Sequence, residues 1–374
     1  MSVFETHIRD LAALAAQGRR RKPIDRAGLD FSSNDYLGLA ASPQLAAAVI
    51  EAIGRGVPLG SGGSRLLRGN HAEHQALEEE AARFFGCESA LFFSTGYAAN
   101  AALLATLPQR GDLVVHDALV HASAHEGMRL GRADHRAAAH NDPDAFADAI
   151  GDWRRAGGAG RVWIAVESLY SMDGDRAPLP ALAELAARHD AVLLIDEAHA
   201  TGVFGPDGRG LAAAYEGAEN VITLRTCGKA LGCEGALLCG PRVVRDFLIN
   251  RARPFIFSTA PSPLVAAAVR AALRLLVEEP ERRTRLRALI GVAERSLAPH
   301  GAVVTGSQIV PIILGDDART MRAADRLQAA GFDVRGIRPP TVPAGTSRLR
   351  ISLTLNVGPG DVTALAEALG EALA

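Results

Sequence analysis

Short apolar runs alternate with segments of helical periodicity through the middle of this 374-residue chain. The runs are Ala90–Phe93, Leu113–His116, Val162–Glu167, Ala191–Asp196, Val221–Leu224 and Ala236–Cys239. Runs this short that are apolar throughout are typical of strands buried on both faces of a parallel sheet. Between them, Ala72–Phe85 and Ala181–His189 carry apolar residues three and four positions apart, as amphipathic helices do. The alternation predicts an α/β fold with a mostly parallel central sheet and helices on both faces.

The pattern changes after about Pro261. Two strand-like runs, Ile309–Leu314 and Arg348–Leu353, flank the helical segment Thr320–Ala330, which predicts a smaller α/β unit at the C-terminus. A chain of this length is also too long for a single small core. We therefore predict three parts: an N-terminal arm at 1–50 that packs with the small domain, a large domain at 51–260, and a small C-terminal domain at 261–374.

Charge and composition exclude several classes of protein. Lys and Arg total 40 and Asp and Glu total 42, so the formal charge of −2 lacks the cationic excess that a nucleic-acid binder needs. The apolar segment Leu264–Leu276 is interrupted by Arg270 and Arg274, and the N-terminus lacks the basic and apolar regions of a secretion signal. The four cysteines lack C-x-x-C spacing. We expect reduced cysteines, no nucleic-acid partner, no membrane span and a cytoplasmic location.

Polar residues follow three of the predicted strands. Ser94–Asn100 leads from a strand into a helix, and Gly96 would let a phosphate approach the free N–H groups there. Asp196 ends a second strand, at the sheet edge where α/β proteins bind ligands. Lys229 follows a third. Each feature alone is weak, but together they offer what pyridoxal 5'-phosphate needs: phosphate donors, an acid for the ring nitrogen and a Schiff-base lysine.

Other interpretations of the same residues fail. The letters D-E-A-H at 196–199 suggest a helicase, but Gly228-Lys229 is followed by Ala230 and belongs to no phosphate-binding loop. His121 and His125 lie four apart, as metal ligands on one helix face can, but H-E-x-x-H is incomplete and no third ligand is evident, so we expect no metal. Asp173-Gly174-Asp175 is better turn chemistry than a pair of catalytic acids.

Further motifs extend along nearly the whole chain. They are Phe31–Leu39, Gly60–His71, Tyr170–Asp175, Asp196–Gly202, Thr226–Gly232, Arg338–Pro343 and Thr346–Ile351. In residues and order, these segments resemble the α-oxoamine synthase family of fold-type I pyridoxal-phosphate enzymes. The resemblance implies a homodimer with shared active sites and a large domain that binds the cofactor.

The resemblance also implies an activity. It is the decarboxylative condensation of L-alanine with a pimeloyl thioester, carried by coenzyme A or acyl carrier protein, in biotin biosynthesis. The alternatives are a family member that uses glycine or serine with another acyl-CoA, and a non-catalytic binding protein of the same fold. The intact set of Lys229, Asp196 and His121 argues against the non-catalytic protein.

Roles in cofactor binding follow from the matched motifs. The implied contacts are Gly96, Tyr97, His121, Ser171, Asp196, His199, Thr226, Lys229, Ser258 and Thr259. Among them Lys229 would form the covalent Schiff base, Asp196 would keep the pyridine nitrogen protonated, and His121 would stack on the ring. His199 would meet the phenolic oxygen, and the segment of Ser258 would reach the phosphate of the neighbouring subunit.

The implied substrate contacts are Arg19, Asn34, Thr341 and Arg350. A guanidinium can bind a carboxylate through two parallel hydrogen bonds, which suits Arg350 to the carboxylate of the amino acid. Arg348 has the same parity on the predicted strand, so both arginines could face one side. The run at 19–21 leaves open which of its arginines meets substrate.

Overall fold

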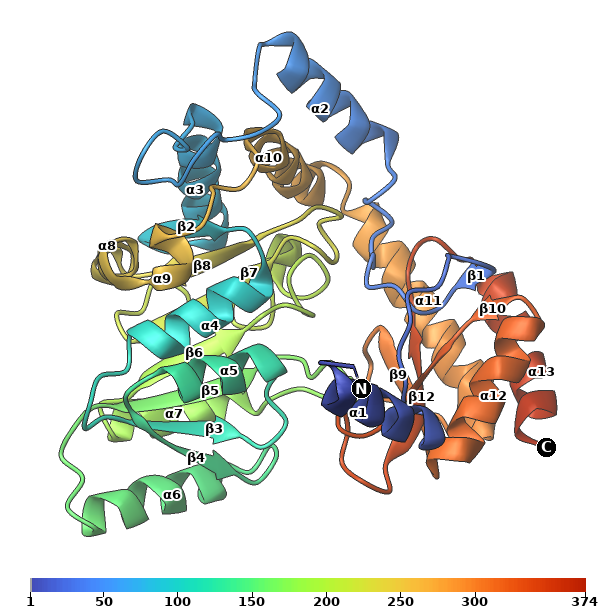
Figure 1. Ribbon diagram of the computed structural model, residues 1–374. Coiled ribbons are helices and arrows are strands. Elements are labelled where there is room, and N and C mark those ends of the chain that lie inside the picture. Colours follow the sequence, from blue (N-terminus) through green and yellow to red (C-terminus); the bar gives the residue numbers. More distant parts are fainter. Residues whose placement is uncertain (1) are drawn as a thin grey trace.

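The computed structural model describes residues 2–374, which form a large sheet unit and a smaller one (Figure 1). The large sheet has the strand order β2-β8-β7-β6-β5-β3-β4. Its strands are β2 (Ser89–Phe93), β3 (Leu113–Asp117), β4 (Asp134–Ala138), β5 (Val162–Glu167), β6 (Val192–Asp196), β7 (Val221–Thr226) and β8 (Ala236–Gly240). β8 runs opposite to the other six strands, which share one direction, so the prediction of a mostly parallel sheet is confirmed.

Helices cover both faces of this sheet (Figure 1). They are α3 (Ala72–Phe85), α4 (Gly96–Thr106), α5 (Ala122–Leu130), α6 (Pro143–Arg155), α7 (Leu179–Arg188), α8 (Arg242–Arg251), α9 (Arg253–Ile256) and α10 (Pro263–Glu278). Successive residues of β6 enter different cores. Leu194 packs in the core with α4 and α5, whereas Leu193 and Ile195 pack in the core with α6 and α7. Burial on both faces explains why the strand is apolar throughout.

The edge strand β4 was not predicted from the sequence. It begins with Asp134, His135 and Arg136, pairs only with β3, and is largely exposed. An edge strand with solvent on one side needs no apolar run, so it carries no hydrophobic signal and its charged residues protect the free edge.

The small unit is built on an antiparallel sheet of order β11-β12-β9. Its elements are β9 (Ile309–Gly315), β11 (Arg335–Ile337), β12 (Ser347–Ser352), α11 (Glu281–Leu297), α12 (Asp317–Ala329) and α13 (Pro359–Leu373). A short strand of the N-terminal segment, β1 (Leu29–Asp30), pairs in parallel with β10 (Phe332–Asp333). The N-terminal segment therefore touches the small unit.

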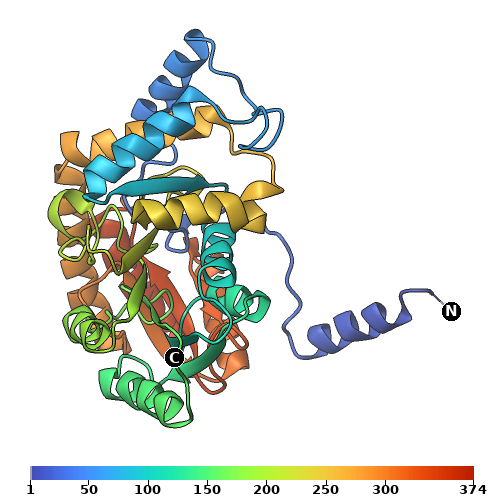
Figure 2. The ribbon, with the colours of Figure 1, turned by 90° about the vertical axis from the view of Figure 1, so that its left-hand side faces the viewer.

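Packing partners change along the chain between α10 and α11. Helix α10 packs against α3 and α2 (Pro43–Gly54), whereas α11 packs against α13. The change lies later in the chain than the predicted boundary at residue 260. Helix α1 (Glu5–Ala16) has no buried residue and stands away from the body of the molecule (Figure 2). Two short 3-10 turns, Pro206–Gly208 and Ala298–His300, complete the elements. Within residues 2–374, no helix combines the length and apolar character that a bilayer crossing requires.

Candidate active site

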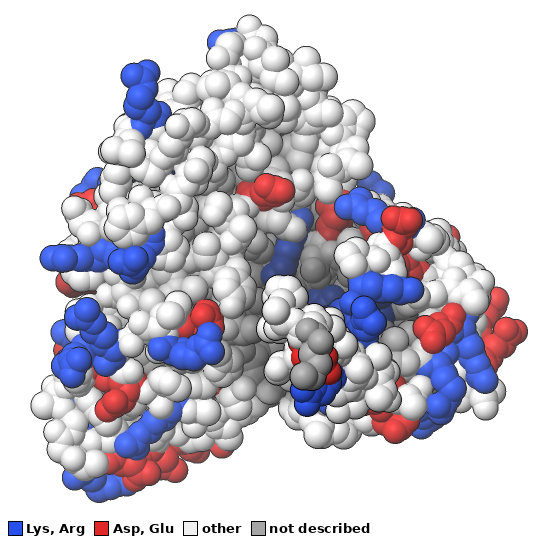
Figure 3. Space-filling model, viewed as in Figure 1, with Lys and Arg blue, Asp and Glu red and all other residues white. Residues whose placement is uncertain are grey.

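The predicted cofactor residues gather where strands of the large sheet end. Asp196 is the last residue of β6, Thr226 is the last of β7, and Lys229 follows it. Gly96 opens α4 directly after β2, and His121 caps α5 shortly after β3. The carboxyl edge of an α/β sheet is the usual place for a ligand. This edge faces the small unit, and Figure 3 shows a hollow between the two units with basic side chains inside it.

Lys229 and His199 are in direct contact. The Nζ of Lys229 lies 3.0 Å from Nε2 of His199, and Nδ1 of His199 lies 2.6 Å from the hydroxyl of Tyr36. Burial lowers the pKa of Lys229 to about 8 and, together with the charge of Lys229, lowers the pKa of His199 well below its ordinary value. His199 is therefore a neutral imidazole with one donor and one acceptor nitrogen.

Hydrogen-bond directions assign the His199 tautomer. Arg350 can only donate, so the atom of Asn34 that faces its Nη2 at 3.1 Å is the carbonyl oxygen. The same oxygen accepts from the Tyr36 hydroxyl at 2.9 Å. The Tyr36 oxygen must then accept from Nδ1–H of His199, which leaves Nε2 to accept from Lys229. One chain of hydrogen bonds thus joins Arg350 to Lys229.

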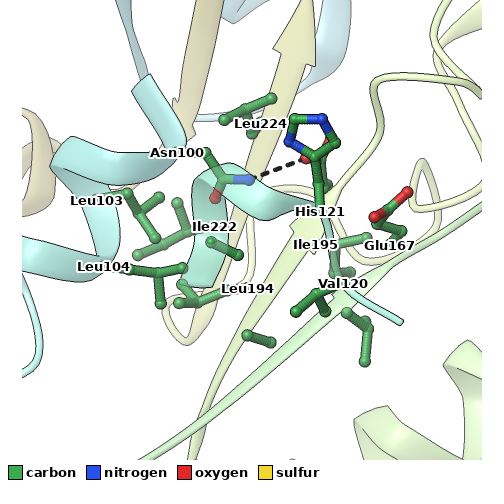
Figure 4. A pocket seen from close by; sticks show the side chains of 14 residues that line it. Asn100, Leu103, Leu104, Val120, His121, Glu167, Leu194, Ile195, Ile222 and Leu224 are labelled. Carbon is green, nitrogen blue, oxygen red and sulfur yellow. Dashed lines mark hydrogen bonds between the residues drawn. The ribbon is translucent and has the colours of Figure 1, made fainter. Parts of the chain in front are cut away.

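Asp196 is held by groups that only donate to it. Its carboxylate accepts from the side-chain nitrogen of Asn100 at 3.1 Å and from the backbone N–H of Ala198 at 2.9 Å. Burial raises the pKa of Asp196, although the nearby charge of Lys229 opposes the shift. Asn100 also donates to Ser123 at 3.1 Å, and the Ser123 hydroxyl lies 2.8 Å from Nδ1 of His121. Figure 4 shows the Asn100 contact as a dashed line, with His121 beside it.

Three of these residues were not predicted as site residues: Tyr36, Asn100 and Ser123. Helical spacing could have indicated Asn100, because it lies four positions after Gly96 and therefore on the same face of α4. Tyr36 lies inside the motif Phe31–Leu39 and is buried in the structure. Buried tyrosines are common in protein cores, so the residue type does not distinguish a site residue from a core residue.

The start of α4 provides a place for an anion. The N–H groups of Gly96 and Tyr97 are the first of the helix and have no intrahelical acceptor. A Cβ at Gly96 would lie 3.4 Å from the Thr226 hydroxyl, in ordinary van der Waals contact, so the start of α4 lies directly against Thr226. A helix start with free N–H groups, the half-buried Asp196 carboxyl and the Lys229 amine are the three partners that pyridoxal 5'-phosphate requires, and the site therefore fits this cofactor.

Arg348 and Arg350 reach the same loop from β12 but have different partners. Arg348 forms an ion pair with Asp173 at 2.5 Å. Arg350 donates to the backbone oxygen of Ser171 at 2.6 Å and to the hydroxyl of Ser352 at 2.7 Å. Within residues 2–374, no carboxylate forms a salt bridge with Arg350. Its charge is therefore available for a substrate carboxylate, whereas that of Arg348 is not.

The remaining predicted residues lie outside this cluster within the single chain. Arg19 forms an ion pair with Asp317 at 2.7 Å, and it is Arg21 that donates to the Thr341 hydroxyl at 3.3 Å. These arginines and Thr341 line a groove of ≈ 730 Å³ between the N-terminal segment and the small unit. Ser258 and Thr259 are exposed on a surface loop after α9.

The predicted turn at Asp173-Gly174-Asp175 is confirmed. Gly174 has a φ of 70° and its N–H donates to the backbone oxygen of Tyr170. Asp175 accepts from His140, outside the Lys229 cluster. Among residues 2–374, no group of three or more His, Cys, Asp or Glu side chains is arranged to hold a metal ion.

Known proteins resemble the chain in sequence. Residues 26–369 match the model of the aminotransferase class I and II family. An 8-amino-7-oxononanoate synthase of Chromobacterium violaceum is 46% identical over 332 residues, which cover 88% of this chain and 85% of that protein.

Solved structures agree. A serine palmitoyltransferase from S. paucimobilis with a bound PLP–myriocin aldimine matches with a TM-score of 0.88 and 28% identity over 99% of this chain and 97% of that one. An 8-amino-7-oxononanoate synthase from Francisella tularensis matches with a TM-score of 0.77 and 27% identity over 93% of this chain and 98% of that one. The predicted fold of a type I pyridoxal-phosphate enzyme is confirmed.

Proposed function

This chain belongs to the 8-amino-7-oxononanoate synthases of the aminotransferase class I and II family, and we propose how its residues perform the reaction of that family. The enzyme is a pyridoxal-phosphate-dependent acyltransferase. It condenses L-alanine with a pimeloyl thioester, releases CO₂ and the free thiol, and forms 8-amino-7-oxononanoate for biotin biosynthesis. The roles of individual residues, the covalent attachment, the thioester carrier and the subunit arrangement are the content of the proposal.

We propose that Lys229 is the covalent attachment point of pyridoxal 5'-phosphate. When bound, the cofactor supplies an electron-withdrawing ring that stabilises negative charge at the Cα of the amino acid. The carboxyl of Asp196 would pair with the ring nitrogen and His121 would cover the ring face. The N–H groups at the start of α4 and the hydroxyl of Thr226 would hold the phosphate.

Three side chains of the protein have separate roles in the reaction of alanine. Arg350 binds the alanine carboxylate, the group that leaves as CO₂, because no carboxylate in the described part of the chain, residues 2–374, forms a salt bridge with it. Lys229 takes the proton from Cα, since a pKa of about 8 leaves a useful fraction of neutral amine near neutral pH. His199 accepts one N–H of Lys229 and so orients the amine toward the substrate.

A single observation carries this assignment. A desolvated lysine just after β7, a half-buried carboxyl at the end of β6 and an arginine of β12 come together where the large sheet faces the small unit, and no carboxylate among residues 2–374 forms a salt bridge with that arginine. Three such groups are not expected in a purely structural core, because burying charged side chains is costly unless they are paired.

The test uses the two lysines of the chain, Lys22 and Lys229. Treating the holoenzyme with borohydride should fix the cofactor to the peptide that contains Lys229, which mass spectrometry identifies. Lys229→Ala should show no fixed cofactor and no measurable turnover, whereas Lys22→Ala, the matched control, should behave as wild type. Normal turnover and cofactor fixation in Lys229→Ala would contradict the proposal.

We propose a homodimer in which Ser258 and Thr259 reach the partner's site. The loop at 59–63 and the segment at 260–262 are joined by hydrogen bonds, and large apolar side chains stand exposed on and beside them: Leu59, Leu67 and Phe257. Exposed apolar surface of this kind marks an interface. Sedimentation of wild type and of Leu67→Glu tests this proposal, since the charged variant should dissociate. The cytoplasmic location remains a prediction.

A further inference from the structure

His140 connects two loops that the reaction uses but lies outside the cluster around Lys229. Its Nδ1 is 2.8 Å from a carboxylate oxygen of Asp117, and its Nε2 is 2.8 Å from a carboxylate oxygen of Asp175. The ring also packs edge-on against Tyr170, with centroids 4.5 Å apart. Both ring nitrogens therefore face carboxylates, which is the arrangement of a singly charged imidazolium that donates two hydrogen bonds.

The Asp117 side of this contact controls the loop to His121. Asp117 is the last residue of β3 and is fully buried. Its carboxylate also accepts from the backbone N–H groups of Leu119 and Asn141, each at 2.8 Å. Only three residues separate Asp117 from His121, the residue proposed to cover the cofactor ring. The orientation of the Asp117 carboxylate therefore limits where His121 can lie.

The Asp175 side controls the loop that supports Arg350. Asp175 closes the turn after β5, where its backbone oxygen accepts from the N–H of Tyr170. The next residue in that turn, Ser171, gives its backbone oxygen to Nε of Arg350. Asn141 donates to the same carboxylate oxygen of Asp175 at 2.7 Å, and its φ of 55° is a conformation in which asparagine is enriched.

The electrostatics agree with this geometry. Burial by itself would lower the pKa of His140, but the hydrogen bonds and charges of Asp117 and Asp175 raise it to about 10. The imidazole therefore carries a proton at neutral pH, and both contacts are charge-assisted.

We propose that His140 is a positioning residue that links the loop bearing His121 to the loop bearing Ser171. Through these loops it fixes His121, which covers the cofactor ring, and Arg350 relative to each other. The inference rests on the proposed roles of His121 and Arg350. It adds a residue that touches neither cofactor nor substrate.

The experiment compares His140→Ala and Asp175→Asn holoenzymes with wild type. His140→Ala should raise the KM for L-alanine about tenfold, as expected for losing charged hydrogen bonds, and should weaken the visible circular dichroism of the bound cofactor. Asp175→Asn should raise the KM for alanine similarly but preserve the dichroism, because the Asp117 contact to the His121 loop survives. His135→Ala on the exposed start of β4 is the matched control and should change neither quantity.

The outcomes separate this inference from the proposed function. If His140→Ala lowers only the melting temperature, and alanine KM and cofactor dichroism stay within about twofold of wild type, His140 is structural and the inference is wrong. If His140→Ala fails to fold, Asp175→Asn decides alone through its alanine KM. Turnover by Lys229→Ala would instead contradict the proposed function and leave the His140 result to be judged by dichroism.

Discussion

The amine of Lys229 lies 3.0 Å from Nε2 of His199, and the directions of the surrounding hydrogen bonds make that nitrogen the acceptor. The neutral imidazole places a lone pair, and not a second positive charge, against the lysine. The lowered pKa of Lys229 comes chiefly from burial, and the neutral imidazole adds no positive charge beside the amine. Through Tyr36 and Asn34 the same chain of hydrogen bonds reaches Arg350, so the proposed base and the proposed carboxylate-binding group are positioned together.

The pH dependence of proton removal should follow Lys229. Burial lowers its pKa to about 8, and only the neutral amine accepts a proton, so exchange of the alanine Cα hydrogen should accelerate as pH rises and level off near pH 8. Deuterium exchange followed by mass spectrometry measures the rate. Lys22→Ala should give the same profile. A break near the ordinary lysine value of 10.5 would show that Lys229 is not desolvated.

Replacing the arginines of β12 should have unequal effects. Arg350→Lys loses the planar fork and should raise the KM for L-alanine roughly 10- to 100-fold. Arg348→Lys can retain its ion pair with Asp173 and should change the KM only a few-fold. Steady-state kinetics at saturating thioester compares the two variants. Equal losses would mean that both arginines bind substrate.

Removing the Asn100 side chain should lower the affinity of the protein for the cofactor. Asn100→Ala deletes the side-chain donor to the half-buried Asp196 carboxylate and also the contact to Ser123, which supports His121. We expect cofactor affinity to fall about tenfold, since a lost hydrogen bond to a charged group has that order of effect. Equilibrium dialysis of the apoenzyme measures it. Gln75→Ala, on the surface of α3, is the control, and unchanged affinity in Asn100→Ala would contradict this role.

The stability contributed by His140 should depend on pH with a defined sign. Its folded-state pKa of about 10 lies above the ordinary value of 6.5, so its contribution is complete below about pH 6.5 and is lost as pH rises toward 10. The melting temperature of wild type should therefore exceed that of His140→Gln most at pH 6.5 and least at pH 10. Thermal denaturation at three pH values tests this expectation. A gap that widens with pH would show that the histidine is neutral in the fold.

Local hydrophobic patterns were sufficient to predict most strands of the large sheet. Val162–Glu167 was predicted with its observed bounds, and the other five apolar runs agree with strands within two residues at either end. Helix α3 also has its predicted bounds. These elements are buried, so their hydrophobic pattern reflects their environment directly. The edge strand β4 and the two-residue strands β1 and β10 are defined by a neighbouring strand, and no periodicity within them reports that partner.

The same division runs through the site. Asp196, His199 and Lys229 stand at strand ends and follow from chemistry that local motifs carry. The family resemblance favoured Arg350 over Arg348, although both have the same strand parity. The physical distinction between them, Asp173 lying against Arg348 from a loop about 175 residues earlier, is visible only in the structure. The contact of Arg21, and not Arg19, with Thr341 likewise joins distant segments.

Residue types and their order were thus enough to predict the fold class, the cofactor and the lysine proposed to bind it, because each prediction depends on short segments with a fixed local geometry. Residue types and their order did not show which charged side chains are paired or protonated. Three properties depend on groups far apart in the chain. They are the pairing of each arginine with a carboxylate, the choice of the accepting nitrogen of His199, and the position of His140 between two carboxylates. Only folding brings those groups within hydrogen-bond distance and removes the water around them, and this desolvation makes their pairing decisive.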